Sequence, residues 1–98
     1  MVITTAARRQ LAEITTYIAR ESGGRGPALG FRKRLLGKCA KLAQLSATLG
    51  TQRPELATEL RSTPVGNYLI FFRYDESRVT VVAVLNASRD VAAQFDED

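Results

Sequence analysis

The chain has 98 residues, 45% of them hydrophobic and 24% charged, which is enough for one globular domain and too little for two. Its single cysteine and its lack of histidine exclude an internal disulfide, histidine-based catalysis and the commonest zinc ligand. Residues 1–53 carry ten Lys and Arg against two acids, whereas residues 54–98 carry four Arg against eight acids, so the N-terminal half either binds an acidic partner, a protein segment or a nucleic acid, or presents a solvated basic helix face.

After a short edge strand at residues 1–3, the pattern predicts an amphipathic helix over residues 5–22. Thr4 suits the N-cap because its hydroxyl can accept from a free amide of the first turn, and Gly23 and Gly24 end the helix. Apolar side chains recur three or four positions apart, as one face of a helix requires: Ala7, Leu11, Ile14 and Ile18.

A second helix is predicted to open at Gly26 and Pro27, because proline at the first helical position gives up no bonded amide. It is expected to run to a C-terminal cap at Gly50. Its apolar stripe contains Phe31, Leu35, Cys39, Leu42, Leu45 and Leu49. Cys39 lies on this stripe and is therefore interpreted as a core residue. The short glycine-rich connection predicts that the two helices form an antiparallel hairpin.

The C-terminal half predicts strands. A loop around residues 51–54 precedes a short strand at residues 58–62 and a turn at residues 64–67. Two β-branched and aromatic runs, residues 68–74 and 79–85, are joined by a polar turn and predict a hairpin of central strands. The expected fold class is therefore α+β, in the order β-α-α-β-β-β, with the helix hairpin covering one face of a small, mainly antiparallel sheet. One domain is expected over residues 1–95, followed by an acidic tail at residues 96–98.

The sequence contains no motif for a cofactor or a metal. Glycine-rich nucleotide loops, paired Cys-x-x-Cys motifs and His-Glu-x-x-His are absent, so neither a cofactor nor a metal site is predicted. No apolar run approaches the roughly 20 residues that cross a bilayer, and residues 1–5 do not resemble an export signal. With one cysteine, the chain is expected in the cytoplasm. Three arginines of the predicted sheet region, Arg61, Arg73 and Arg89, could bind phosphate as a metal-independent ribonuclease requires, or pair with nearby acids.

Residues 66–73 contain the pattern Gly-x-Tyr-x-x-x-Phe-Arg, and residues 84–90 contain Val-Leu-x-x-x-Arg-Asp. Glu59, Leu60 and Arg61 precede both patterns, and the predicted helix hairpin opens near Thr4. In this order and spacing, over essentially the whole chain, these features resemble the ParE branch of the RelE/ParE toxin superfamily.

The resemblance implies the toxin of a bacterial type II toxin–antitoxin system, which is neutralised by a ParD-like antitoxin and poisons DNA gyrase without catalysis. RelE-type ribonucleases combine basic residues on the sheet with a late tyrosine or similar acid–base group. This chain ends with Gln94, Phe95 and Asp96 before its last two acids, so the resemblance favours gyrase. Two alternatives stay open: a ribosome-dependent mRNA endoribonuclease that uses Arg61, Arg73 and Arg89, and a non-toxic module whose basic helices hold nucleic acid.

The antitoxin-binding surface is expected on the helix hairpin. Its cations lie beside an apolar stripe, which would suit an acidic, amphipathic antitoxin tail. The residues predicted to pair with that tail are Arg20, Arg32, Arg34, Lys38 and Lys41.

Overall fold

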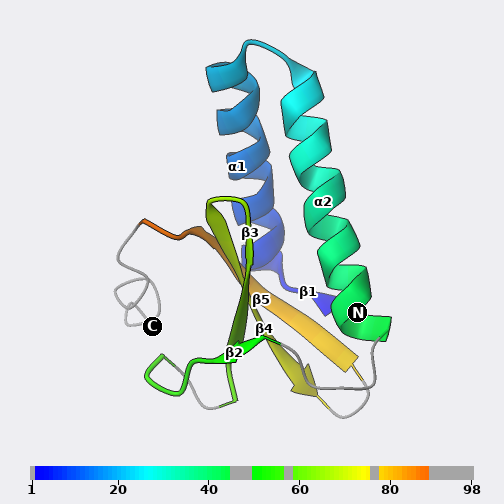
Figure 1. The fold of residues 1–98 in the computed structure, drawn as a ribbon, viewed down its shortest axis with the longest axis vertical. Coiled ribbons are helices and arrows are strands. Elements are labelled where there is room, and N and C mark those ends of the chain that lie inside the picture. Colours follow the sequence, from blue (N-terminus) through cyan, green and yellow to red (C-terminus); the bar gives the residue numbers. More distant parts are fainter. Residues whose placement is uncertain (1, 45–49, 57–58, 76–77, 89–98) are drawn as a thin grey trace.

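The structure is a computed structural model that describes residues 2–44, 50–56, 59–75 and 78–88. Two helices pack on one face of a five-stranded sheet (Figure 1). The elements are β1 (Val2–Ile3), α1 (Thr5–Ser22), α2 (Arg25–Gln44), β2 (Thr51–Gln52), β3 (Arg61–Val65), β4 (Tyr68–Asp75) and β5 (Arg78–Asn86). The predicted α+β class and the helix hairpin on the sheet are confirmed. The two-residue strand β2 lies where the sequence predicted a loop.

Local capping sets the ends of the helices. The side chain of Thr4 accepts a hydrogen bond from the backbone N–H of Ala7, and Gly23 closes α1 in the left-handed conformation at φ 74°, both as predicted. Helix α2 begins at Arg25, one residue earlier than expected, and is described as far as Gln44. Its predicted continuation through Leu45 and Leu49 lies outside the described residues.

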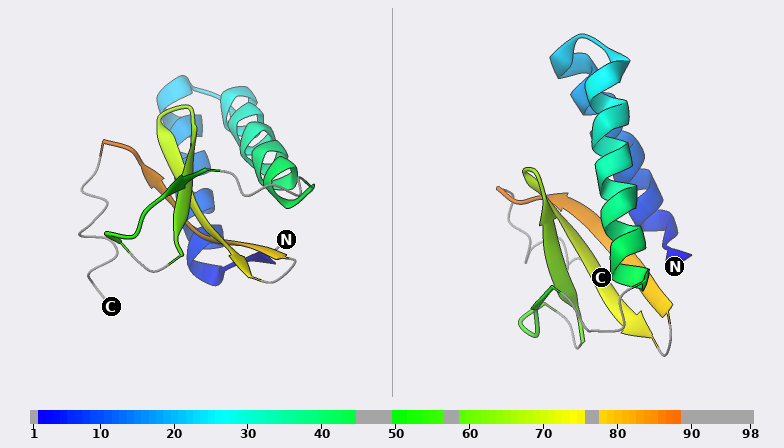
Figure 2. Two further views of the ribbon diagram at one scale, coloured as in Figure 1. Left: turned by 60° about the horizontal axis from the view of Figure 1, so that its bottom comes forward. Right: turned by 45° about the vertical axis from the view of Figure 1, so that its right-hand side comes forward.

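The strand order is β1-β5-β4-β3-β2, so β4 and β5 have a neighbour on each side, as predicted for central strands. Strand β1 pairs in parallel with β5, and the other pairs are antiparallel. The two further views show both helices lying over the same face of the sheet, with the connected end of the hairpin extending beyond it (Figure 2).

The main core lies between the helices and the sheet. Its fully buried members include Leu35 and Cys39 of α2 and Ile70 and Phe72 of β4. A register shift in the β4–β5 ladder pairs Phe71 with Ala83 but Phe72 with Val81. The shift leaves one extra residue in β5, so that Val81 and Val84 both reach the core.

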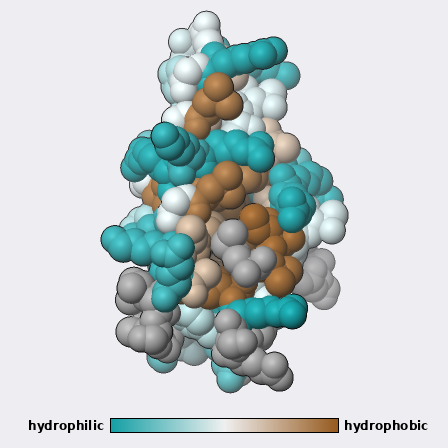
Figure 3. Space-filling model, turned by 90° about the vertical axis from the view of Figure 1, so that its right-hand side faces the viewer, coloured by the Kyte–Doolittle hydropathy of each residue, from teal (hydrophilic) through white to brown (hydrophobic). Residues whose placement is uncertain are grey.

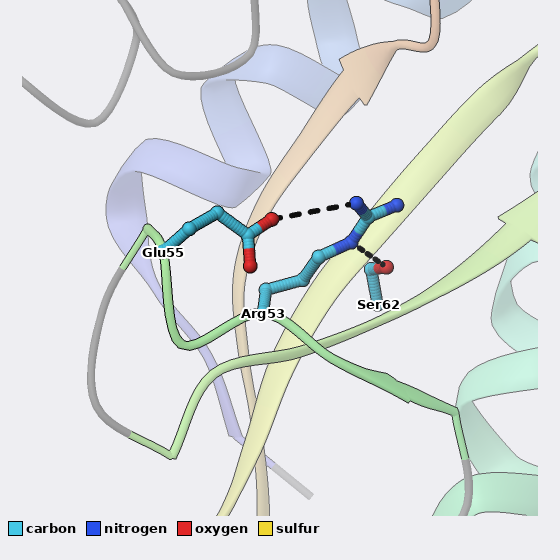
Figure 4. A network of polar contacts seen from close by, with 3 residues as sticks. All are labelled: Arg53, Glu55 and Ser62. Carbon is cyan, nitrogen blue, oxygen red and sulfur yellow. Dashed lines mark hydrogen bonds and ion pairs between the residues drawn. The ribbon is translucent and has the colours of Figure 1, made fainter.

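A second, smaller cluster covers part of the opposite face of the sheet. It contains Leu60, Phe71, Ala83 and Leu85. The segment between β2 and β3 contributes Leu60 and is fastened to β3 by Arg53, whose Nε donates to Ser62 Oγ at 2.9 Å. The same guanidinium lies 3.6 Å from a carboxylate oxygen of Glu55 (Figure 4). The sheet is therefore apolar on both faces, as the nearly continuous apolar runs of β4 and β5 require.

Two boundaries around β3 differ from the prediction. The strand predicted at residues 58–62 begins at Arg61, because Glu59 adopts a left-handed φ of 64° that a β-strand does not accommodate. Pro64 and Val65 belong to β3, and the turn is confined to Gly66 and Asn67. Proline is tolerated there because β2 pairs only with the first two residues of β3, so at Pro64 no described strand needs a donor. The predicted tail at residues 96–98 lies outside the described residues.

Candidate functional site: two grooves beside the β3–β4 turn

The first groove lies between α2 and β3 and has a volume of about 330 Å³. Its lining comprises Arg34, Gly37, Lys38, Lys41 and residues 64–66. We call it the basic groove, because it contains three cations and no acid. No ion pair joins these cations to another residue within the described ranges. The groove therefore presents concentrated positive charge to an approaching partner.

Helical spacing explains why the cations converge. Positions 34, 38 and 41 are four and three residues apart and lie on one flank of α2, next to the face that enters the core. Gly37 leaves the middle of this flank without a side chain. At the upper end, a Cβ placed on Gly66 would lie 3.8 Å from a guanidinium nitrogen of Arg34. The turn after β3 thus closes one end of the basic groove.

The structure brings together three of the five residues predicted to bind an antitoxin. Arg32 is two positions from Arg34, which is about 200° around the helix, so it lies on the other flank of α2. Arg20 is exposed in the last turn of α1 and does not line the groove either. Of the predicted set, only three residues therefore line one common groove: Arg34, Lys38 and Lys41.

A second groove, which the sequence analysis did not predict, lies between α1 and the β4–β5 pair and has a volume of about 420 Å³. Its apolar part includes Tyr17, which is 57% exposed, and Tyr68. Its polar rim is formed by Arg9, Gln10, Glu13 and Asn86. The one feature of the sequence that could have indicated this groove is Tyr17, a large aromatic residue next to the predicted apolar face of the first helix. The two grooves lie on either side of the β3–β4 turn.

The arginines of the nuclease alternative do not form one constellation. Arg61 pairs with Phe72 and so lies on the helix-covered face of the sheet, whereas Arg73 pairs with Thr80 and lies on the other face. Arg61 lines a third groove with Glu59 and Tyr74 and donates from Nη2 to the carbonyl oxygen of Gly50 at 3.1 Å. Arg89 lies outside the described residues.

Within the described ranges, no group of three or more His, Cys, Asp or Glu residues could hold a metal ion. Cys39 is fully buried, and its burial raises the pKa of the thiol above the ordinary value of 9.0. The thiol is therefore protonated and inaccessible, which agrees with its interpretation as a core residue. In the same part of the chain, neither helix is long and apolar enough to cross a membrane.

Comparison with known families decides the identity of this fold. The model of the ParE toxin of type II toxin–antitoxin systems, parDE, matches residues 1–91. The chain belongs to the ParE toxin family. This membership agrees with the resemblance read from the patterns at Gly66–Arg73 and Val84–Asp90. ParE toxins form one branch of the RelE/ParE superfamily.

A solved structure supports the same fold. The chain is similar to a chain of a chromosomal ParDE toxin–antitoxin system from P. aeruginosa, with a TM-score of 0.73 and 17% sequence identity. The similarity covers 90% of this chain and 97% of that chain. No curated protein sequence matches this chain. The two proteins therefore share an architecture despite a low level of identity.

Proposed function

We propose that this ParE protein acts in the cytoplasm as a toxin that poisons DNA gyrase without catalysis and is neutralised by a ParD-like antitoxin. Membership of the ParE family over residues 1–91 is the observation that carries the proposal. The geometry of the basic groove and the placement of the sheet arginines add support from the molecule itself.

The basic groove supports the antitoxin part of the proposal. Arg34, Lys38 and Lys41 project beside the apolar side chain of Val65 and have no ion pair with another described residue. An acidic antitoxin tail could pair its carboxylates with these cations and place apolar side chains against the sheet. Arg20 and Arg32 belong to the predicted set but lie away from this groove, so we expect them to contribute less.

The sheet supports a non-catalytic mode of action. A ribonuclease without histidine needs several cations around one phosphate and a group that transfers a proton. Arg61 and Arg73 lie on opposite faces of the sheet, so they cannot contact the same phosphate. The third groove, which Arg61 lines with Glu59 and Tyr74, contains only one guanidinium among the described residues. It therefore lacks the several cations that such a ribonuclease needs.

A gyrase assay tests the proposal. Purified toxin is incubated with gyrase, ATP and relaxed plasmid, and the products are separated on an agarose gel after protein denaturation. We expect supercoiling to fall and linear plasmid to accumulate, because a poisoned gyrase holds cleaved DNA that is not resealed. A reaction with a type I topoisomerase is the control and should be unaffected. Addition of the antitoxin should restore supercoiling.

The same protein preparation can be used to test whether the protein is a ribonuclease instead of a gyrase poison. In a translation reaction that contains ribosomes, a ribosome-dependent endoribonuclease would cut mRNA at defined positions, and replacement of Arg61, Arg73 and Arg89 by Ala would abolish the cuts. We expect intact mRNA. Cleavage of mRNA together with normal gyrase activity would reverse the assignment.

A further inference from the structure

The helix hairpin carries many more cations than those that line the basic groove. Residues 5–44 contain nine Lys and Arg against two acids. Three of the nine line the basic groove, and Arg9 lines the second groove. Within the described ranges, none of the nine forms an ion pair. Unpaired like charges repel one another, and a polyanionic partner would relieve this repulsion.

Four of the remaining cations lie in the part of the hairpin that extends beyond the sheet, which we call the hairpin tip (residues 20–33) (Figures 1 and 2). They are Arg20, Arg25, Arg32 and Lys33, and all four are exposed. The only acid of the tip is Glu21. On α2, Arg25 and Arg32 are seven residues apart and so lie on one side of the helix, with Lys33 next to them. Their separation along the helix axis is about 10 Å.

Three glycines and the exposed Leu29 form part of the remaining surface of the tip. A Cβ placed on Gly24, Gly26 or Gly30 would meet no atom within 4 Å, so no contact within the described chain explains these glycines. Gly26 and Gly30 lie inside α2, where glycine is an unfavourable helix former. At these glycines, a ligand can approach the helix backbone while the long cations nearby reach around it.

Charge, more than apolar surface, distinguishes the tip. Figure 3 shows that the apolar surface on this side of the molecule is narrow near the tip and widens toward the middle of the face, with hydrophilic side chains at its edges. Leu29, at 63% exposure, is the one large apolar side chain that the described residues expose on α2. A protein interface needs a desolvated apolar core. The phosphate backbone of a nucleic acid needs only cations that can replace its counterions.

We propose that the hairpin tip binds the phosphate backbone of duplex DNA, independently of base sequence, through Arg25, Arg32 and Lys33. Arg25 and Arg32 lie on the flank of α2 opposite to the basic groove, and Lys33 lies about 100° around the helix from Arg34, so an antitoxin in that groove and DNA at the tip would use different cations. The proposal does not depend on gyrase as the target, because it concerns DNA binding by the free toxin.

The test measures binding of the full-length toxin to a fluorescein-labelled 20-base-pair duplex of arbitrary sequence by fluorescence anisotropy, at salt concentrations from 50 to 200 mM. We expect affinity to fall linearly on a log–log plot against salt, and to be the same for a duplex of scrambled sequence. In the variant Arg25→Gln, Arg32→Gln, Lys33→Gln, binding should weaken at least about tenfold at 50 mM salt. Its salt slope should become shallower by about one for each phosphate that the variant no longer neutralises.

The matched control is Arg34→Gln, Lys38→Gln, Lys41→Gln, which removes the same charge from the basic groove. It should lose much less affinity, and circular dichroism should show both variants folded. Equal losses in the two variants would mean that net charge alone acts and would overturn the proposal. Absence of binding at 50 mM salt would also overturn it. So would equal binding of poly-glutamate through the same three cations, which would make the tip a surface for an acidic protein.

Discussion

Gly50 shows how one residue can be fixed by its distant neighbours. It has a left-handed φ of 81°, and a Cβ placed on it would lie 2.7 Å from Cζ of Phe72 and 2.8 Å from the carbonyl oxygen of Ser62. We expect Gly50→Ala to lower the free energy of unfolding by about 2 kcal/mol or more, from backbone strain and overpacking together. Urea denaturation measures the change.

Gly37 provides the control for this substitution. It lies within α2, and an added Cβ would meet nothing within 4 Å, so Gly37→Ala should stabilise the protein by about 1 kcal/mol through helix propensity. The two substitutions add the same methyl group with opposite expected signs. A variant Gly50→Ala as stable as the parent protein would contradict the close approach of Phe72 to Gly50.

Residues whose role is local could be predicted from the sequence, and residues whose role depends on distant contacts could not. Thr4 as N-cap and Gly23 as C-cap are confirmed because capping involves only neighbours in the chain. Gly50 was interpreted as a helix cap. Its close approach to Phe72 depends on how the segment before β2 folds against β4, which no local pattern reveals.

At the level of elements, a side chain of α1 makes a hydrogen bond to the backbone of β5 where the short strand β1 no longer pairs with it. Strand β1 pairs with only two residues of β5, and beyond it Gln10 Oε1 accepts a hydrogen bond from the backbone N–H of Val84 at 2.8 Å. Thr4 Oγ1 likewise donates to the carbonyl oxygen of Val82 at 3.0 Å. These bonds satisfy backbone groups on the edge of β5 that would otherwise be unpaired beneath the helix.

Replacing Gln10 tests this connection. Gln10→Met keeps the approximate size of the side chain but removes the acceptor, so we expect a loss of about 1–3 kcal/mol in the free energy of unfolding and faster hydrogen exchange at the Val84 amide. Gln10→Glu keeps an acceptor oxygen and should stay close to the parent protein. Equal stability and equal exchange in both variants would show that the bond to Val84 contributes nothing.

The elements themselves were predictable where periodicity was strong. The stripe of α1 and the apolar runs of β4 and β5 gave the correct type and approximate limits of each element, because burial imposes those patterns. Strand β3 was misplaced because the positive φ of Glu59 and the unpaired edge at Pro64 arise from the arrangement of neighbouring strands. Sequence rules for turns could not anticipate either feature.

For the whole molecule, the fold class could be predicted, but the shape of the candidate site only in part. The excess of cations on the hairpin was visible in the sequence, yet the division of those cations between two flanks of α2 required helix geometry and the position of β3. The second groove was missed because its walls come from α1, β4 and β5, which are far apart in the sequence. Grooves between distant elements leave no local pattern.

The distribution of charge over the molecule predicts how the proposed antitoxin associates. Cations around the basic groove should speed the encounter with an acidic tail, whereas apolar contacts inside the interface should set the rate of dissociation. We expect the variant Arg34→Ala, Lys38→Ala, Lys41→Ala to associate several-fold more slowly at low salt and to show a flatter salt dependence, while the complex stays intact on gel filtration. Stopped-flow fluorescence with labelled antitoxin measures the association rate.

The variant Arg25→Ala, Arg32→Ala, Lys33→Ala is the matched control, because it removes the same charge from α2 at positions that do not line the basic groove. If attraction acts through the basic groove, this control should slow association less than the groove variant does, since electrostatic forces between exposed charges decay over about 10 Å at 0.1 M salt. An unchanged association rate in the groove variant at low salt would place the antitoxin elsewhere on the toxin. In that case the second groove, beside Tyr17 and Tyr68, would be the next surface to test by the same measurement.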